Sequence, residues 1–178
     1  MSKQTLFLIC ITFLLMNPIY SDEYSDEYAK DPTWNTGKDD LRHLKGTNSN
    51  FKKAKDAIKQ AKRYAKKGRA NKAKKRFNDV IKFLALANKE NPNQPDILNL
   101  LGYSFKEVGD FAMAEIYYEQ GLTTNLQHIG INEYLGELYV ETNRIDKAKE
   151  RLAVLENCNC EEYAELKGII EGAKKSKY

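Results

Sequence analysis

Three carboxylates in the second half of the chain recur at helical spacing and could bind a cationic group. Glu133, Glu137 and Glu141 stand at i, i+4 and i+8, so a helix would place all three on one face. We call them the acidic row. The spacing leaves two interpretations open: the row either holds a basic peptide or protein segment, or it is a charged helix face in contact with solvent.

Cys158 and Cys160 are a second pair of side chains that could do chemistry, because a single residue separates them. In an oxidising compartment two cysteines can form a bridge, although so small a ring is tight and easier to reduce. The alternatives are a disulfide or thiol pair within the chain, pairing with another molecule, and a pair of metal ligands. Structural zinc needs four ligands, and the only histidines are His43 and His128, so we expect no metal site.

Motifs of the common enzyme classes are absent from the sequence. It contains no G-x-S-x-G, no H-E-x-x-H, no P-loop and no G-x-G-x-x-G. Its six serines and two histidines stand in no such setting. We therefore expect a protein that is not an enzyme and needs no cofactor. A thiol oxidoreductase built on the two cysteines is the remaining enzymatic alternative.

Charge is distributed unevenly along the chain. Residues 51–82 carry 14 Lys or Arg against two Asp, residues 95–172 carry 6 basic and 15 acidic residues, and residues 22–40 carry seven carboxylates against two lysines. Such a chain can attract opposite charges at its two ends. The basic hairpin, residues 52–82, either contacts anionic lipid or is solvated, with its many lysines reflecting compositional bias. Few aromatic residues accompany them, so we expect no nucleic-acid partner.

The first 21 residues have the layout of a secretory signal. Lys3 precedes an apolar run of eleven, residues 6–16, and Ser21 offers a small residue at the cleavage edge. Eleven apolar residues are too few to span a bilayer. We therefore expect residues 1–21 to be a cleaved signal peptide and the protein to be exported. The alternative is an uncleaved N-terminal anchor.

Residues 22–49 are polar and show no sustained period, so we expect a disordered acidic leader. Within it, Trp34 is either exposed or loosely docked, or it belongs to a short segment that meets a partner. From residue 50 to 178 the sequence predicts one helical domain and no strand. Apolar residues recur every three to four positions, with Asp96 as the expected N-cap of the third helix. The expected helices cover residues 51–67, 70–89, 97–108, 111–123, 130–141, 145–156 and 161–174.

A 34-residue period runs through the second half of this helical region. Leu101-Gly102 recurs as Leu135-Gly136, and Ala114 recurs as Ala148. Small residues at fixed spacing between amphipathic helices allow one helix hairpin to stack closely on the next.

These positions resemble the tetratricopeptide repeat (TPR) family, whose 34-residue pattern places Leu-Gly, an aromatic residue and Ala at the same offsets. The copies are residues 95–128 and 129–162, with a weaker one from about residue 54 that contains roughly seven additional residues before Pro95. That insertion should lengthen its second helix by about two turns. The resemblance implies a right-handed α-solenoid of about three TPR-like helix hairpins, with residues 161–174 as a C-terminal capping helix.

In this family the first helices of the repeats line a concave groove that usually binds peptides. The resemblance therefore implies that the groove residues here are Lys55, Lys62, Lys66, Asn99, Tyr103, Lys106, Glu107, Glu133, Glu137 and Glu141. The Lys/Asn carboxylate clamp of chaperone-binding members is not present, so that class of partner is not implied. The expected function is a protein–protein interaction or assembly module.

More narrowly, residues 132–139 and the Cys-Glu-Glu-Tyr at 160–163 resemble small exported TPR proteins of alphaproteobacteria. This resemblance implies a bacterial periplasmic location and a disulfide before the Glu-Glu-Tyr, where this chain has Cys158 and Cys160. The alternative function is a membrane-associated adaptor, facing the periplasm, that uses an uncleaved N-terminal anchor and the basic hairpin.

Overall fold

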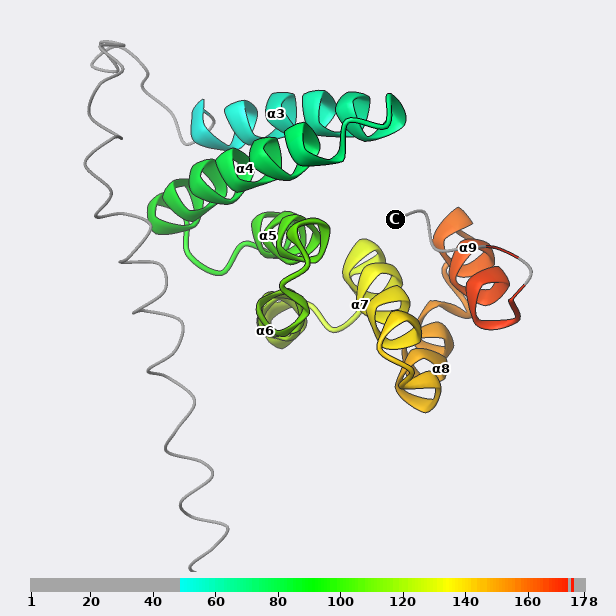
Figure 1. Ribbon diagram of the computed structural model, residues 1–178. Coiled ribbons are helices and arrows are strands. Elements are labelled where there is room, and N and C mark those ends of the chain that lie inside the picture. The colour runs from blue at the N-terminus through cyan, green and yellow to red at the C-terminus, as the bar shows by residue number, and fades with distance from the viewer. Residues whose placement is uncertain (1–48, 173, 175–178) are drawn as a thin grey trace, which may run out of the picture. The chain divides into compact units, whose positions relative to one another are not determined.

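The computed structural model describes residues 49–172 and 174, so the expected signal peptide, residues 22–48 of the expected leader, and Trp34 lie outside the described residues. The described part is all-helical and contains no strand (Figure 1). The helices are α3 (Ser49–Lys66), α4 (Ala70–Glu90), α5 (Pro95–Val108), α6 (Phe111–Thr124), α7 (Ile129–Glu141), α8 (Ile145–Leu155) and α9 (Glu161–Ile170). Among them, none is both long and apolar enough to cross a membrane.

Consecutive helices pair as hairpins, α3 with α4, α5 with α6 and α7 with α8 (Figure 1). Helix α5 packs on α4, α7 packs on α6 and α5, and α9 packs on α7 and α8. Three hairpins and a final capping helix confirm the predicted architecture. Each hairpin lies against the next because its own two helices cannot bury their apolar faces alone.

Helix α4 is amphipathic, as the period of three to four residues predicts. Its buried residues are Ala73, Phe77, Val80, Ile81, Leu84 and Ala87, all at a spacing of three or four. Helix α4 has 21 residues and α6 has 14, so the first repeat carries seven more. These add about two turns, as the insertion predicts.

Two glycines permit close approach between helices. A β-carbon at Gly102 would lie 2.5–2.8 Å from three ring atoms of Tyr118, in the same hairpin. A β-carbon at Gly136 would lie 2.5 Å from the side chain of Leu166. The second contact joins α7 to α9, so the capping helix fills the space over the last repeat's glycine.

The helix ends differ from the sequence prediction by two residues or more in three places. Helix α3 begins at Ser49, two residues before its expected start and inside the expected leader. Asp96 is not the N-cap of α5, because the helix begins at Pro95, two residues before the expected start, and Gln94 takes the cap position. Pro is well suited to the first helical position, where its missing N–H has no partner to lose. Helix α9 ends at Ile170, about one turn earlier than predicted, and Gly172 follows with a φ of +71°.

Candidate partner-binding groove

The first helices of the three hairpins carry all the groove residues implied by the repeat pattern. Lys62 and Lys66 on α3 are exposed, and Asn99 and Glu107 on α5 are half-buried. Four others are buried, with relative exposures of 5% or less: Tyr103, Lys106, Glu133 and Glu137. The candidate groove therefore combines accessible charges at its edges with a polar cluster that belongs to the packed interior.

Tyr103 connects the three hairpins through its ring. Its centroid lies 5.7 Å from that of Phe77 on α4 and 5.5 Å from that of Tyr134 on α7. The Lys62 ammonium lies 4.8 Å from the same ring, a distance at which a cation is attracted to an aromatic face. The aromatic contacts thus hold α5 in place between its neighbours.

Lys106 pairs with two members of the acidic row. Its Nζ lies 2.9 Å from Glu137 Oε2 and 3.2 Å from Glu141 Oε1. The side chains of Lys106 and Glu137 are 2% and 0% exposed, whereas that of Glu141 is 21% exposed. Removing one partner of a buried ion pair destabilises a protein by about 3–5 kcal/mol. Lys106 therefore ties α5 to α7 and neutralises part of the row.

Glu107 lies beside this cluster with an unusual carboxyl group. Burial raises its pKa above the ordinary 4.5, and the nearby Lys106 and Lys62 ammonium groups and the Tyr103 hydroxyl offset this only in part. The buried Glu107 Oε1 has no hydrogen-bond partner. A buried acceptor without a donor is unfavourable, which agrees with the raised pKa of this carboxyl group.

A cavity of about 320 Å³ lies at the turn between α3 and α4, and we call it the turn pocket. The periodicity places Ala65 on the apolar inner stripe of α3, but the structure leaves it exposed at the mouth of this pocket. Ala65 stands in the last turn of α3, which ends at Lys66. The residues that line the pocket are Ala65, Gly68, Ala70, Asn71, Ala73, Lys74, Phe77 and Glu107.

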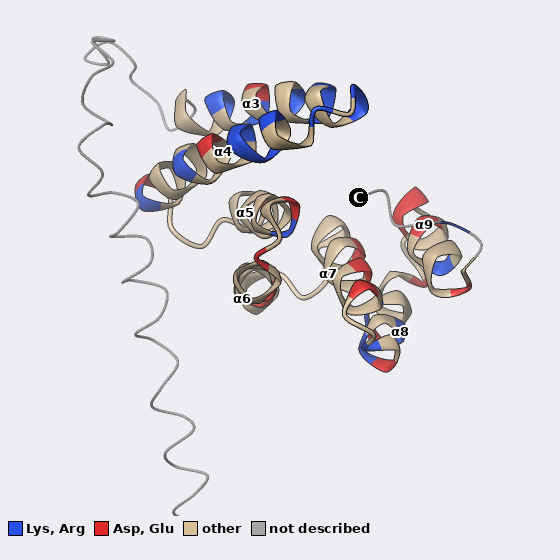
Figure 2. Cartoon of the chain, in the orientation of Figure 1, with Lys and Arg blue, Asp and Glu red and all other residues tan. Residues whose placement is uncertain are grey.

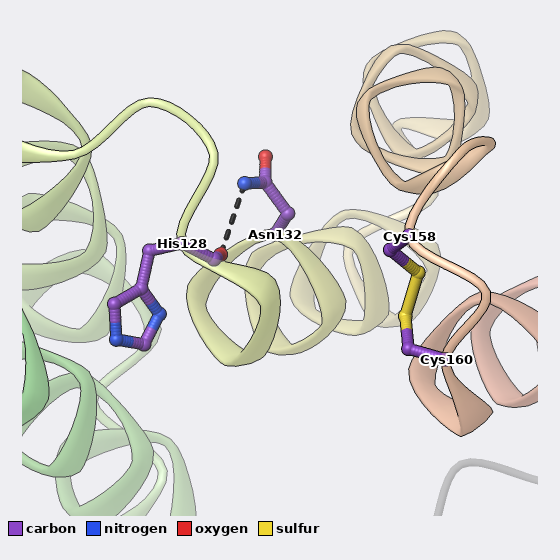
Figure 3. The surroundings of a disulfide bond; sticks show 4 residues. All are labelled: His128, Asn132, Cys158 and Cys160. Carbon is purple, nitrogen blue, oxygen red and sulfur yellow. Dashed lines mark hydrogen bonds between the residues drawn. A yellow bond between two sulfur atoms is a disulfide. The ribbon is translucent and has the colours of Figure 1, made fainter.

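Two polar residues at the start of α7 have structural roles that the sequence analysis did not anticipate (Figure 3). His128 caps the helix, since its Nδ1 accepts a hydrogen bond from the Ile131 N–H at 3.1 Å. Its Nε2 therefore carries the proton and donates to Asp96 on α5 at 3.2 Å. Asn132, fully buried, donates to the carbonyl oxygens of His128 and Leu126, both at 3.0 Å.

A disulfide joins Cys158 to Cys160 in the turn between α8 and α9, with a Cα–Cα distance of 5.2 Å (Figure 3). Asn159 between them has a φ of +50°, a backbone conformation that Asn adopts more readily than most residues. Within the described residues, no three His, Cys, Asp or Glu side chains are grouped so that they could hold a metal ion.

Residues 95–128 match the family model of the tetratricopeptide repeat, and these residues form α5, α6 and the turn before α7. The fold is similar to that of the first TPR of Spaghetti (RPAP3) bound to the HSP90 peptide SRMEEVD. The TM-score is 0.50 with 19% sequence identity, over 70% of this chain and 95% of that chain. No curated protein matches the sequence. The described helices therefore form a TPR-type α-solenoid of helix hairpins, in which residues 95–128 are also recognised as a repeat by sequence.

Proposed function

We propose that this chain is a non-enzymatic interaction module that holds a peptide or protein segment along α3, α5 and α7. The supporting observation is that these helices carry accessible charges of both signs. The exposed Lys62 lies over the Tyr103 ring, and the partly exposed Glu141 lies beside Lys106. The similar solved structure is a protein bound to a peptide. At 19% identity that likeness carries the fold alone, so the binding of a peptide by this chain rests on its own side chains.

Along α7 the partner segment would be basic. The acidic row and Lys106 together carry three negative charges and one positive charge, so the cluster remains net negative. Glu141 is the most exposed carboxylate of the acidic row, so a cationic side chain of the partner would contact this residue first. Charge complementarity of this kind contributes mainly to specificity and to the rate of association.

The test measures the binding of a labelled lysine-rich peptide to the full chain. Fluorescence anisotropy is the readout, at low and at high salt. We expect Glu141→Gln to weaken binding roughly three- to tenfold at low salt, and salt to reduce the difference. Glu150→Gln on the exposed face of α8 is the matched control and should have no effect. Equal binding by the wild type and Glu141→Gln would exclude the acidic row as a partner surface.

We further propose that the protein is exported to a bacterial periplasm, on the strength of the signal layout in residues 1–21. Expression of the full gene, cell fractionation and intact-mass measurement test this. A soluble periplasmic species that begins near Asp22 is the expected result. An intact Met1 in the membrane fraction would instead support the membrane-associated adaptor.

The adaptor is the second candidate function, and the basic hairpin supports it. Lys and Arg gather on α3 and α4 in Figure 2, and the side chains of Lys52 and Lys59 are 79% and 76% exposed. Exposed lysines near an anionic membrane each contribute about 1 kcal/mol of attraction. Co-sedimentation with vesicles that contain anionic lipid, but not with neutral vesicles, is the expected result for this function.

A further inference from the structure

We propose that the end of the first hairpin, at the turn between α3 and α4, docks end-on against an anionic lipid surface. The contact is made by the eight Lys and Arg from Lys62 to Lys75, which we call the basic tip. This inference rests on the second candidate function, the adaptor, and assigns the part of the basic hairpin that contacts the membrane.

The basic tip is exposed and is not neutralised by residues near it in the sequence. All eight of its cations are exposed. Residues 57–78 contain ten Lys or Arg and no Asp or Glu. Asp56, before this stretch, already lies beside Lys52 and Lys59, and Asp79, after it, pairs with an arginine outside the tip. The charge compensation along the hairpin therefore stops short of its end.

Other helices compensate the tip only at Lys62. Its ammonium lies over the Tyr103 ring and near Glu107, both on α5. For the other seven cations the structure shows no ion pair within the described residues. A group of uncompensated like charges raises the local potential and attracts a surface of opposite charge.

An end-on approach brings the whole tip close to one plane. Helix α3 ends at Lys66 and α4 begins at Ala70, with Lys and Arg on both sides of the turn (Figure 2). At 1.5 Å per residue, the tip extends about 6 Å back along α3 and about 8 Å along α4. These lengths do not exceed the Debye length of about 8 Å at physiological ionic strength, so all eight cations can act together. A side-on approach would turn part of the tip away from the lipid.

The side chains at the turn favour a lipid surface over a nucleic acid. Proteins that bind single strands stack the bases on aromatic side chains, but Tyr64, the one aromatic residue of the tip segment 62–75, is half-buried. Ala65, Gly68 and Ala70 are exposed and small, so no bulky side chain at these positions holds the lysines away from a flat surface. Clusters of four to eight Lys or Arg are typical of segments that bind anionic lipid.

The experiment compares charge-neutralised variants of the full chain in co-sedimentation with vesicles of phosphatidylcholine, with and without phosphatidylglycerol. The tip variant carries Lys66→Gln, Lys67→Gln and Lys72→Gln. We expect it to bind the anionic vesicles roughly 100-fold more weakly than wild type, because each lysine near the surface contributes a factor of about five. High salt should abolish the difference.

The matched control removes the same charge from exposed positions toward the other end of the hairpin, through Lys52→Gln, Lys55→Gln and Lys89→Gln. These residues lie more than a Debye length from the turn along their helices, so we expect a loss below about threefold. Circular dichroism establishes that both variants are folded. The apolar run at residues 6–16 is the same in every variant, so its own affinity for lipid cancels in the comparison.

A DNA duplex is the second probe, with fluorescence anisotropy as the readout. Weak binding that is the same for the tip variant and the control variant is expected. Binding tighter than that to the anionic vesicles, and lost in the tip variant, would overturn the proposal by assigning the tip to a nucleic acid.

The proposal and the adaptor function fail in different ways. If wild type prefers anionic vesicles and the two variants lose binding equally, the basic tip is wrong and the adaptor stands. If wild type binds anionic and neutral vesicles equally, the adaptor itself is wrong.

Discussion

Gly102 sets the distance between α5 and α6. An alanine there would place its β-carbon 2.5–2.8 Å from ring atoms of Tyr118, a buried side chain with no room to move away. We expect Gly102→Ala to destabilise the protein by about 1–3 kcal/mol, because overpacking exceeds the roughly 1 kcal/mol that alanine gains in helix propensity. Urea unfolding followed by circular dichroism measures the change.

Gly168→Ala is the control for that substitution. Its β-carbon would meet only side-chain atoms of Lys174, at 3.0–3.6 Å, and the end of a flexible lysine can shift. We expect a neutral or slightly stabilising effect. Similar losses of stability in both variants would mean that the contact with Tyr118 does not determine the packing.

Glu107 gives the protein a pH-dependent stability. Because burial raises its pKa above 4.5, the folded state binds this proton more tightly than the unfolded chain does. Its favourable contribution is therefore complete below the unfolded pKa and is lost as the pH rises through the folded pKa. We expect Glu107→Gln to raise the melting temperature relative to wild type at neutral pH, with a smaller difference near pH 4.5. A difference independent of pH would contradict this.

The site could be predicted from the sequence only in part. The spacing of the acidic row is visible because its members share one helix. Lys106 meets Glu137 across 31 residues, and the turn pocket collects side chains from α3, α4 and α5, so neither has a local pattern. His128 was missed because helix caps are usually Ser, Thr, Asp or Asn.

At the scale of helices, the turns between them depend on a few capping residues. Gly109 ends α5 with a φ of +88°, and Asp110 then caps α6 by accepting a hydrogen bond from the Met113 N–H at 3.1 Å. This carboxylate satisfies one of the four N–H groups that a helix start leaves without an intrahelical partner. The turn thus fixes where the second helix of the hairpin begins.

We expect Asp110→Ala to destabilise the protein by about 1 kcal/mol, since the cap hydrogen bond is lost and the charge near the helix start is removed. Gln94→Ala is the matched control, because Gln94 occupies the N-cap of α5 but makes no side-chain cap hydrogen bond. Equal effects in thermal melts would show that the cap of α6 does not contribute.

The helices themselves were largely predictable, because the 3.6-residue period and the 34-residue period point to the same elements. The length of α4 follows from the seven-residue insertion. The differences from the prediction fall at helix ends, which depend on single residues. Pro95 moves the start of α5, and Gly172, with its positive φ, follows the early end of α9.

At the scale of the whole described domain, charge separates along the hairpins. Basic residues gather on α3 and α4, and acidic residues on α7 and α9 (Figure 2). The acidic row on α7 and the lysines of α3 and α4 follow this separation. A partner with both an acidic and a basic segment would therefore bind in one orientation.

The capping helix determines whether the last hairpin is stable. Leu166 and Ile169 of α9 are 0% and 5% exposed, and Leu166 fills the space over Gly136. A chain that ends at Asn157 would expose this apolar face of α7 to water, and repeat arrays need a polar outer cap. We expect this truncated chain to lose several kcal/mol of stability, because each large core side chain removed costs about 2–5 kcal/mol. We also expect the exposed apolar face to make it associate in gel filtration. A chain that ends at Gly172 keeps α9 and should behave like the full protein. Equal urea midpoints for the two truncations would mean that α9 does not act as the cap.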